Sequence, residues 1–130
     1  MNKTLLVIDD DAAVRESLGE VLQLGGFEAA GAGSAEEAMA MLEYLQPAVV
    51  IVDYHLTGIN GAEATRQIRA RHPSIAVLAI SAERQRRDEL LDAGASAFLP
   101  KPIDAEVLIT TASRIGQCRA GEASWSSRSG

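Results

Sequence analysis

The sequence predicts an α/β protein: a single doubly wound domain of five βα units, with a five-stranded parallel sheet and helices on both faces. Short apolar runs alternate five times with longer amphipathic segments, which is the pattern of consecutive βα units. Three of the five runs are apolar at every position, as are strands buried on both faces of a parallel sheet. The connections are short, so right-handed crossovers would place helices on both faces of the sheet.

The predicted strands differ in their apolar character, and this predicts their place in the sheet. The runs 5–8, 48–52 and 75–80 contain only Ala, Val, Leu and Ile, so we expect them to be central strands. The runs 27–30 and 95–99 are weaker because they include Glu or Ser, so they are expected at the edges.

The helices are predicted from apolar stripes and from their start and stop signals. Ser34 with Glu37 forms a capping-box pattern, and we expect the helix that follows to continue to the residue before Pro47. Asp11 and Asp104 are expected to cap the first and last helices. The helical segments are marked by the stripe 14–22 before Gly25, the stripe 38–45 before Pro47, Ala64 and Ile68 before Pro73, residues 84–93 before Gly94, and the stripe 107–115 after Asp104.

The 130 residues fit one domain and leave no room for a second catalytic or DNA-binding module. We expect residues 1–118 to form this domain. Periodicity ends there, and residues 119–130 are rich in Ser and Gly, which indicates a flexible tail or linker. Whether the chain works alone or belongs to a longer protein stays open.

Charge and composition restrict the function classes. The net charge of −6 and the pI near 4.8 argue against nucleic acid or an anionic membrane as a direct partner. Cys118 is the only cysteine, so no internal disulfide or multi-cysteine zinc site is possible, and a reducing, cytoplasmic location is expected. No signal peptide or membrane span is predicted.

Arginines gather around the third and fourth predicted helices, either as a solvated face or as a surface for an acidic partner.

Polar side chains follow four of the predicted strands. Residues Asp9–Asp11 come directly after the first strand, Asp53 ends the third, Ser81 follows the fourth, and Lys101 follows the fifth. The carboxyl ends of parallel strands open into one crevice, so we expect these side chains to lie close together.

These residue types predict a phosphoryl-transfer site. Crowded carboxylates repel each other unless a cation lies between them, and a site with oxygen ligands alone is typical of Mg²⁺. Asp53 would be the nucleophile. Mg²⁺ and Lys101 would stabilise charge on the phosphoryl oxygens, and Ser81 would donate a hydrogen bond to one of them.

The segments that carry these residues, 5–11, 50–61, 80–82 and 98–102, resemble the receiver domain of two-component response regulators. The resemblance covers residues 1 to about 118 and implies a flavodoxin-like fold. It also implies that Asp53 accepts a phosphoryl group from the phosphohistidine of a sensor histidine kinase or a histidine phosphotransfer protein. Catalysis would be limited to the domain's own phosphorylation and slow dephosphorylation.

The resemblance also implies roles for the surrounding residues. Asp10, Asp53 and the backbone carbonyl of His55 match the metal ligands of the family, and Asp9 would reach the metal through water.

Ser81 matches the switch hydroxyl, Phe98 the switch aromatic and Lys101 the phosphate-binding lysine, with a cis peptide bond before Pro102. Phosphorylation would bias the face formed by the fourth helix, fifth strand and fifth helix toward a downstream protein or a homodimer.

Two positions depart from the family pattern. Phe98 stands where Tyr is frequent, so a flip of its ring would carry no hydroxyl signal. Thr57 and Gly58 follow Leu56 where the family often has Pro, so this loop is expected to be more mobile. His55 and Glu83 are expected to flank the water that hydrolyses the acyl phosphate.

The alternative is a haloacid-dehalogenase-like phosphatase with Asp9 as nucleophile and Asp11 as acid/base. Against it, Ala13 stands where that family usually has Thr, no cap domain fits, and Asp53 is left without a role. Nucleotide binding is excluded because no glycine-rich phosphate loop follows any strand.

Overall fold

A five-stranded parallel sheet forms the middle of the protein, which a computed structural model describes for residues 2–117. The strands are β1 (Thr4–Ile8), β2 (Glu28–Ala32), β3 (Val49–Asp53), β4 (Ala76–Ser81) and β5 (Ala97–Pro100). The helices are α1 (Ala12–Leu24), α2 (Ala35–Met41), α3 (Gly61–Arg71), α4 (Arg87–Asp92) and α5 (Ala105–Gln117), with a 3₁₀ turn, η1 (Arg84–Arg86), before α4. The expected domain boundary at 118 and the tail 119–130 lie outside the described residues.

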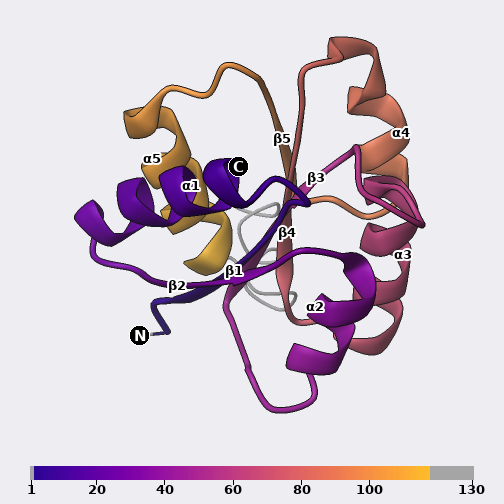
Figure 1. The fold of residues 1–130 in the computed structure, drawn as a ribbon, viewed down its shortest axis with the longest axis horizontal. Helices are drawn as coiled ribbons and strands as arrows, with labels where there is room; N and C mark the ends of the chain where they lie inside the picture. Colours follow the sequence, from indigo (N-terminus) through magenta and orange to yellow (C-terminus); the bar gives the residue numbers. More distant parts are fainter. Residues whose placement is uncertain (1, 118–130) are drawn as a thin grey trace, which may run out of the picture.

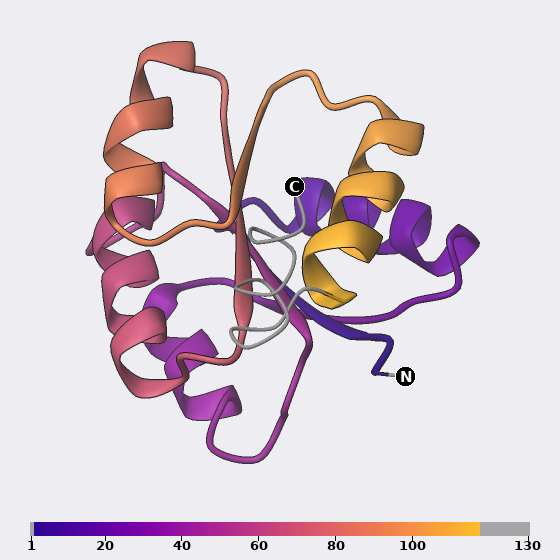
Figure 2. The same cartoon turned by 180° about the vertical axis from the view of Figure 1, so that it is seen from behind.

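The helices cover both faces of the sheet. Figure 1 shows α1 and α5 on one side and α2, α3 and α4 on the other, and Figure 2 shows the same layers from behind. The strand order is β2-β1-β3-β4-β5, and every neighbouring pair is parallel. The predicted doubly wound α/β fold is therefore confirmed, with the two weaker runs at the edges.

The central strands bury both of their faces. Leu6 and Ile8 of β1 pack into the cluster under α2, α3 and α4, whereas Leu5 and Val7 pack into the cluster under α1 and α5. Each of these side chains is at most 1% exposed, and burying such a side chain contributes about 1.5–3 kcal/mol. The all-apolar runs are thus explained by two cores, one on each side of the sheet.

The predicted helix caps are present. Asp11 accepts hydrogen bonds from the amides of Ala13 and Val14 at 2.9 and 3.3 Å. Ser34 Oγ accepts from Glu37 N at 3.0 Å, and Asp104 accepts from Val107 N at 3.0 Å. The start of each of these helices therefore follows from a local signal in the sequence.

The second helix is shorter than predicted. It ends at Met41 instead of running to Pro47, because the amides of Glu43 and Tyr44 bond to carbonyls three residues back and tighten the chain into turns. Leu42 and Leu45 still pack on the core beyond the helix, so the apolar stripe continues where the helix does not.

Two edge strands are shifted relative to the prediction. β2 begins at Glu28, because Phe27 turns into the core under α1 and α5 instead of joining the ladder. β5 begins at Ala97, which is the first residue to pair with β4, opposite Leu78. The amide of Ser96 donates to the carbonyl of Val77 as the chain enters the sheet.

In the described residues no helix has the length and apolar character needed to cross a membrane.

Candidate functional site

Two buried carboxylates and one lysine meet at the carboxyl edge of the sheet. Asp9 follows β1 and Asp53 ends the neighbouring strand β3, and the two residues are 1% and 6% exposed. Lys101 Nζ lies 3.3 Å from Asp53 Oδ1 and 3.8 Å from Asp9 Oδ2. The sheet thus brings together three residues that are far apart in the sequence, as predicted.

Asp9 is only partly satisfied by its neighbours. Its Oδ1 accepts a hydrogen bond from Asp11 N at 2.9 Å, but Oδ2 is buried and accepts none among the described residues. Burial raises the pKa of Asp9 above its ordinary value of 3.8, and the nearby carboxylate of Asp53 raises it further, while the Asp11 amide and Lys101 act in the opposite direction. A buried carboxylate oxygen that accepts no hydrogen bond and lies beside a second carboxylate favours a bound cation.

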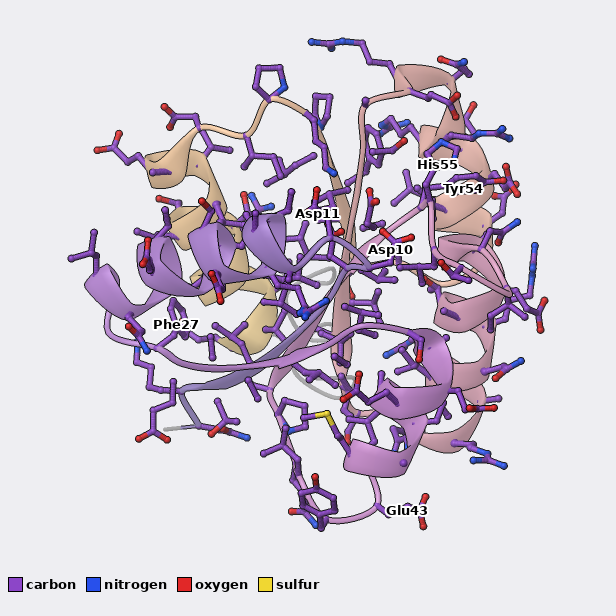
Figure 3. All side chains as sticks on the ribbon, in the orientation of Figure 1. Asp10, Asp11, Phe27, Glu43, Tyr54 and His55 are labelled. Carbon is purple, nitrogen blue, oxygen red and sulfur yellow. The ribbon has the colours of Figure 1, made fainter. Side chains whose placement is uncertain are left out.

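Asp10 is exposed and turns toward the loop after β3. Its Oδ2 accepts a hydrogen bond from Thr57 Oγ1 at 3.2 Å, and Figure 3 shows its side chain where the chain leaves β1. In residues 2–117 no three acidic, His or Cys side chains gather closely enough to form a metal site by themselves. The structure therefore places Asp9 and Asp53 together, whereas the Asp10 side chain is held by Thr57 and does not join them in a preformed metal site.

Ser81 ends β4 and is fully buried. Its Oγ accepts from Glu83 N at 3.0 Å, which leaves the hydroxyl proton as a donor. Its carbonyl accepts from Lys101 N at 2.9 Å, so Ser81 and the lysine are tied together across β4 and β5. The peptide bond between Lys101 and Pro102 is cis, as the resemblance implies.

Phe98 lies on β5 and is half-buried against the cluster under α2, α3 and α4. The expected switch aromatic thus contacts the side of the sheet that carries α4.

A network of polar side chains surrounds the site on the α4 side. His55 Nε2 and Arg86 Nε both contact Glu83 Oε1, at 3.1 and 2.8 Å. The hydrogen bond from Arg86, followed by that from His55, holds the pKa of Glu83 below its ordinary value of 4.5. His55 and Glu83, which the sequence predicts near the site, therefore form one contact at its rim.

Tyr54 is a site neighbour that sequence reasoning missed. It is 6% exposed, donates from its hydroxyl to Glu89 Oε2 at 3.2 Å, and lies with its ring 4.3 Å from the Arg86 guanidinium. Figure 3 shows Tyr54 and His55 next to α4. The hydroxyl of a buried tyrosine usually finds a hydrogen-bond partner. The position of Tyr54 directly after an apolar run is the only feature of the sequence that indicates such a contact.

Gly61 allows α3 to start against the backbone of the site. A Cβ at this position would lie 2.5 Å from the carbonyl oxygen of Asp53 and 2.7 Å from Tyr54 Cα. The amide of Gly61 donates to the carbonyl of Tyr54 at 2.7 Å. Glycine is therefore required by a close approach of two backbone segments.

Comparisons with known proteins agree with this geometry. The family model described as the response regulator receiver domain matches residues 5–113. The chain is similar to the response regulator MprA of Mycobacterium tuberculosis, at 34% identity over 111 residues, which is 84% of this chain and 48% of MprA. It is also similar to a cyclic di-GMP phosphodiesterase of Thermotoga maritima, at 34% identity over 107 residues, or 81% of this chain and 28% of that protein. The chain thus spans less than half the length of these two relatives.

Solved structures show the same likeness. A response regulator from Chloroflexus aurantiacus superposes with a TM-score of 0.84 at 29% identity, covering 89% of this chain and 98% of that one. The receiver domain of NtrX from Brucella abortus gives 0.82 at 29% identity, covering 87% and 98%. These matches give no support to the haloacid-dehalogenase-like alternative. The chain belongs to the response regulator receiver domain family of two-component systems.

Proposed function

We propose that Asp53 is the phosphoacceptor of this receiver domain. An Asp53 oxygen attacks the phosphorus of a phosphohistidine on a sensor histidine kinase or a histidine phosphotransfer protein. The new P–O bond forms as the P–N bond breaks, and the imidazole leaves and takes up a proton. The observation that carries the proposal is the position of Asp53: a buried carboxylate at the end of a central strand, with Lys101 Nζ 3.3 Å away. Receiver domains interact with such kinases and with downstream effectors.

Asp9, Asp10, Asp53 and the backbone carbonyl of His55 are proposed to hold Mg²⁺, the ion that this family generally binds at its phosphorylation site. The oxygen-only ligand set fits this ion, and so does the buried Oδ2 of Asp9, which accepts no hydrogen bond among the described residues. When bound, Mg²⁺ supplies positive charge that offsets the carboxylates and the incoming phosphoryl oxygens. The hydrogen bond from Thr57 uses Oδ2 of Asp10, so the other carboxylate oxygen would be available to the ion.

The remaining site residues are proposed to stabilise the phosphoryl group and to transmit its presence to the face formed by α4, β5 and α5. Lys101 pairs with a phosphoryl oxygen, and Ser81 donates its hydroxyl proton to another. Movement of Ser81 toward the phosphate frees space beside Phe98, whose ring then moves inward. The face formed by α4, β5 and α5 thereby changes its affinity for a downstream protein or a second copy of the chain.

The test uses a small phosphodonor. With acetyl phosphate or carbamoyl phosphate and Mg²⁺, intact mass should show one added phosphoryl group, and both Asp53→Asn and EDTA should abolish it. Equal labelling of the wild type and Asp53→Asn, or label mapped to Asp9, would contradict the proposal.

A further inference from the structure

Arg15 reaches back from the first turn of α1 to the backbone of the acidic cluster. Its Nη1 donates a hydrogen bond to the carbonyl oxygen of Asp9 at 2.6 Å. β1 ends one residue earlier, at Ile8. The carbonyl of Asp9 therefore lies just beyond the strand, and a side chain supplies its hydrogen bond.

The peptide bond that Arg15 holds leads directly into Asp10. A peptide unit is planar, so fixing the Asp9 carbonyl also fixes the Asp10 amide and the direction of the chain at that point. Two further groups of Asp9 are also held: its amide donates to Ala32 O at 3.1 Å, and its Oδ1 accepts from Asp11 N. Arg15 completes this set of backbone constraints on the two aspartates.

Two glycines at the end of β2 provide the space for this side chain. A Cβ at Gly31 would lie 3.3 Å from Arg15 Cδ, and a Cβ at Gly33 would lie 3.3 Å from Arg15 Nη1. Both distances are tighter than ordinary van der Waals contact. Neither glycine has a positive φ, so the backbone conformation does not require glycine at either position. A methyl group at either position would require the Arg15 side chain to shift by a few tenths of an ångström.

We propose that Arg15 is a positioning residue for the metal site: by holding the Asp9 carbonyl it aims the carboxylates of Asp9 and Asp10, and Gly31 and Gly33 form the groove in which it lies. This inference rests on the proposed function and deepens it, because it names a residue that acts on the site without contacting the ion. Partners that orient metal ligands typically contribute about 10- to 100-fold to metal affinity.

The first experiment measures Mg²⁺ binding to the unphosphorylated full chain by calorimetry. Arg15→Met should raise the Kd for Mg²⁺ about tenfold or more, and Arg15→Lys, which keeps a donor, should raise it less. Arg69→Met is the matched control, because Arg69 also donates to backbone carbonyls, those of Pro73 and Ile75 at the opposite end of the sheet. It should lose stability without changing the Kd.

A second variant tests the groove while keeping the guanidinium. Gly33→Ala should displace Arg15 and weaken Mg²⁺ binding, even if Arg15→Met folds poorly. Gly19→Ala is its control, because a Cβ there meets only Ala29 Cβ at 3.9 Å, an ordinary contact. The amide resonance of Asp10 in the metal-free protein should shift in Arg15→Met and Gly33→Ala and stay in place in both controls.

The outcomes separate this inference from the proposed function. Wild-type Mg²⁺ affinity in Gly33→Ala and in folded Arg15→Met, with the Asp10 resonance unmoved, would overturn the positioning role and leave phosphorylation at Asp53 intact. A wild type that neither binds Mg²⁺ nor is phosphorylated would overturn both. Weaker binding in both Arg69→Met and Arg15→Met would show a general effect of lost stability and also overturn the inference.

Discussion

The hydroxyl of Tyr54, the residue after the proposed phosphoacceptor, donates a hydrogen bond to Glu89 of α4 at 3.2 Å. Arg86 lies over the same ring and also contacts Glu89, at 3.2 Å. The end of a central strand is thereby attached to the start of α4, one of the three elements that form the proposed output face. A displacement of Tyr54 would therefore either move α4 or break the contacts of its side chain with Glu89 and Arg86.

Removing this hydroxyl should loosen α4. Tyr54→Phe should lower the free energy of unfolding by about 0.5–1.5 kcal/mol, the usual net contribution of a hydrogen bond. Urea denaturation measures the loss, and hydrogen exchange should be faster at the amides of α4. Tyr44→Phe is the control, because Tyr44 is 75% exposed. Unchanged exchange in α4 would show that the Tyr54–Glu89 contact does not hold the helix.

The same tyrosine predicts a pH dependence. Burial, and then the hydrogen bond with Glu89, raises the pKa of Tyr54 above its ordinary value of 10.0. The folded state therefore holds this proton more tightly than the unfolded state, so its contribution is complete below pH 10 and is lost as the pH rises through the folded value. Wild type should lose more stability than Tyr54→Phe between neutral pH and alkaline pH, measured by denaturant melts. Parallel curves would contradict this assignment.

Neutralising Asp9 should stabilise the protein without metal. Its pKa is raised chiefly by burial, so its contribution to stability is complete below pH 3.8 and is lost as the pH rises through the folded value. At pH 7 in EDTA, Asp9→Asn should therefore raise the free energy of unfolding, measured by denaturant melts. Asp53→Asn should gain less, because Lys101 already pairs with Asp53 at 3.3 Å.

Bound Mg²⁺ should reverse the order of stability, so that wild type becomes more stable than Asp9→Asn. Wild type should gain about 2.7 kcal/mol at a hundredfold excess over Kd, and Asp9→Asn should gain less. Asp11→Asn is the control, since Asn caps a helix about as well as Asp. A wild type whose stability does not respond to Mg²⁺, or an Asp9→Asn variant that is less stable in EDTA, would mean that Asp9 is only a hydrogen-bond acceptor.

Gly61 should tolerate no side chain. In Gly61→Ala the new Cβ would lie 2.5 Å from Asp53 O, and since both neighbouring atoms are backbone, either α3 or the end of β3 must move. We expect a loss of about 1–3 kcal/mol, as for other overpacked sites, together with slower phosphorylation. Gly19→Ala, whose new Cβ makes only an ordinary contact with Ala29, should leave phosphorylation unchanged and gain about 0.5–1 kcal/mol of stability, because Ala is favoured over Gly inside a helix. A fully active, stable Gly61→Ala would refute the close approach.

His55 and Glu83 should control the lifetime of the acyl phosphate. Their side chains touch at 3.1 Å on the rim of the site, so removing either should open the approach for water. His55→Ala and Glu83→Ala should each speed dephosphorylation severalfold and leave phosphorylation nearly unchanged, and the double variant should be no faster than the singles. Decay is followed by intact mass after the phosphodonor is removed. Wild-type decay in both single variants would rule out this role.

The sequence predicts much of this molecule because its signals are local or topological. Runs of Val, Ile and Leu identify β1, β3 and β4, since only strands buried on both faces need them. The parallel order then brings Asp53, Ser81 and Lys101 to one edge without further information.

Contacts between distant side chains leave no such signal. The pairing of Tyr54 with Glu89, 35 positions away, depends on how α4 packs, and the hydrogen bond from Arg15 to Asp9 depends on a bend that no periodicity shows. The early end of α2 was missed for a related reason: Leu42 and Leu45 reach the core from turns as well as they would from a helix.

The residues proposed to carry the chemistry and those around them belong to different parts of the fold. Asp9, Asp53 and Ser81 sit at the ends of strands held by neighbours on both sides, whereas His55 and Glu83 occupy loops with more exposed side chains. A change at a loop position costs little stability, while a change at a strand end disturbs two adjoining strands. On the predicted role of His55 and Glu83, substitutions at these loop positions would change how long the phosphorylated state persists and would leave the fold and the proposed transfer reaction in place.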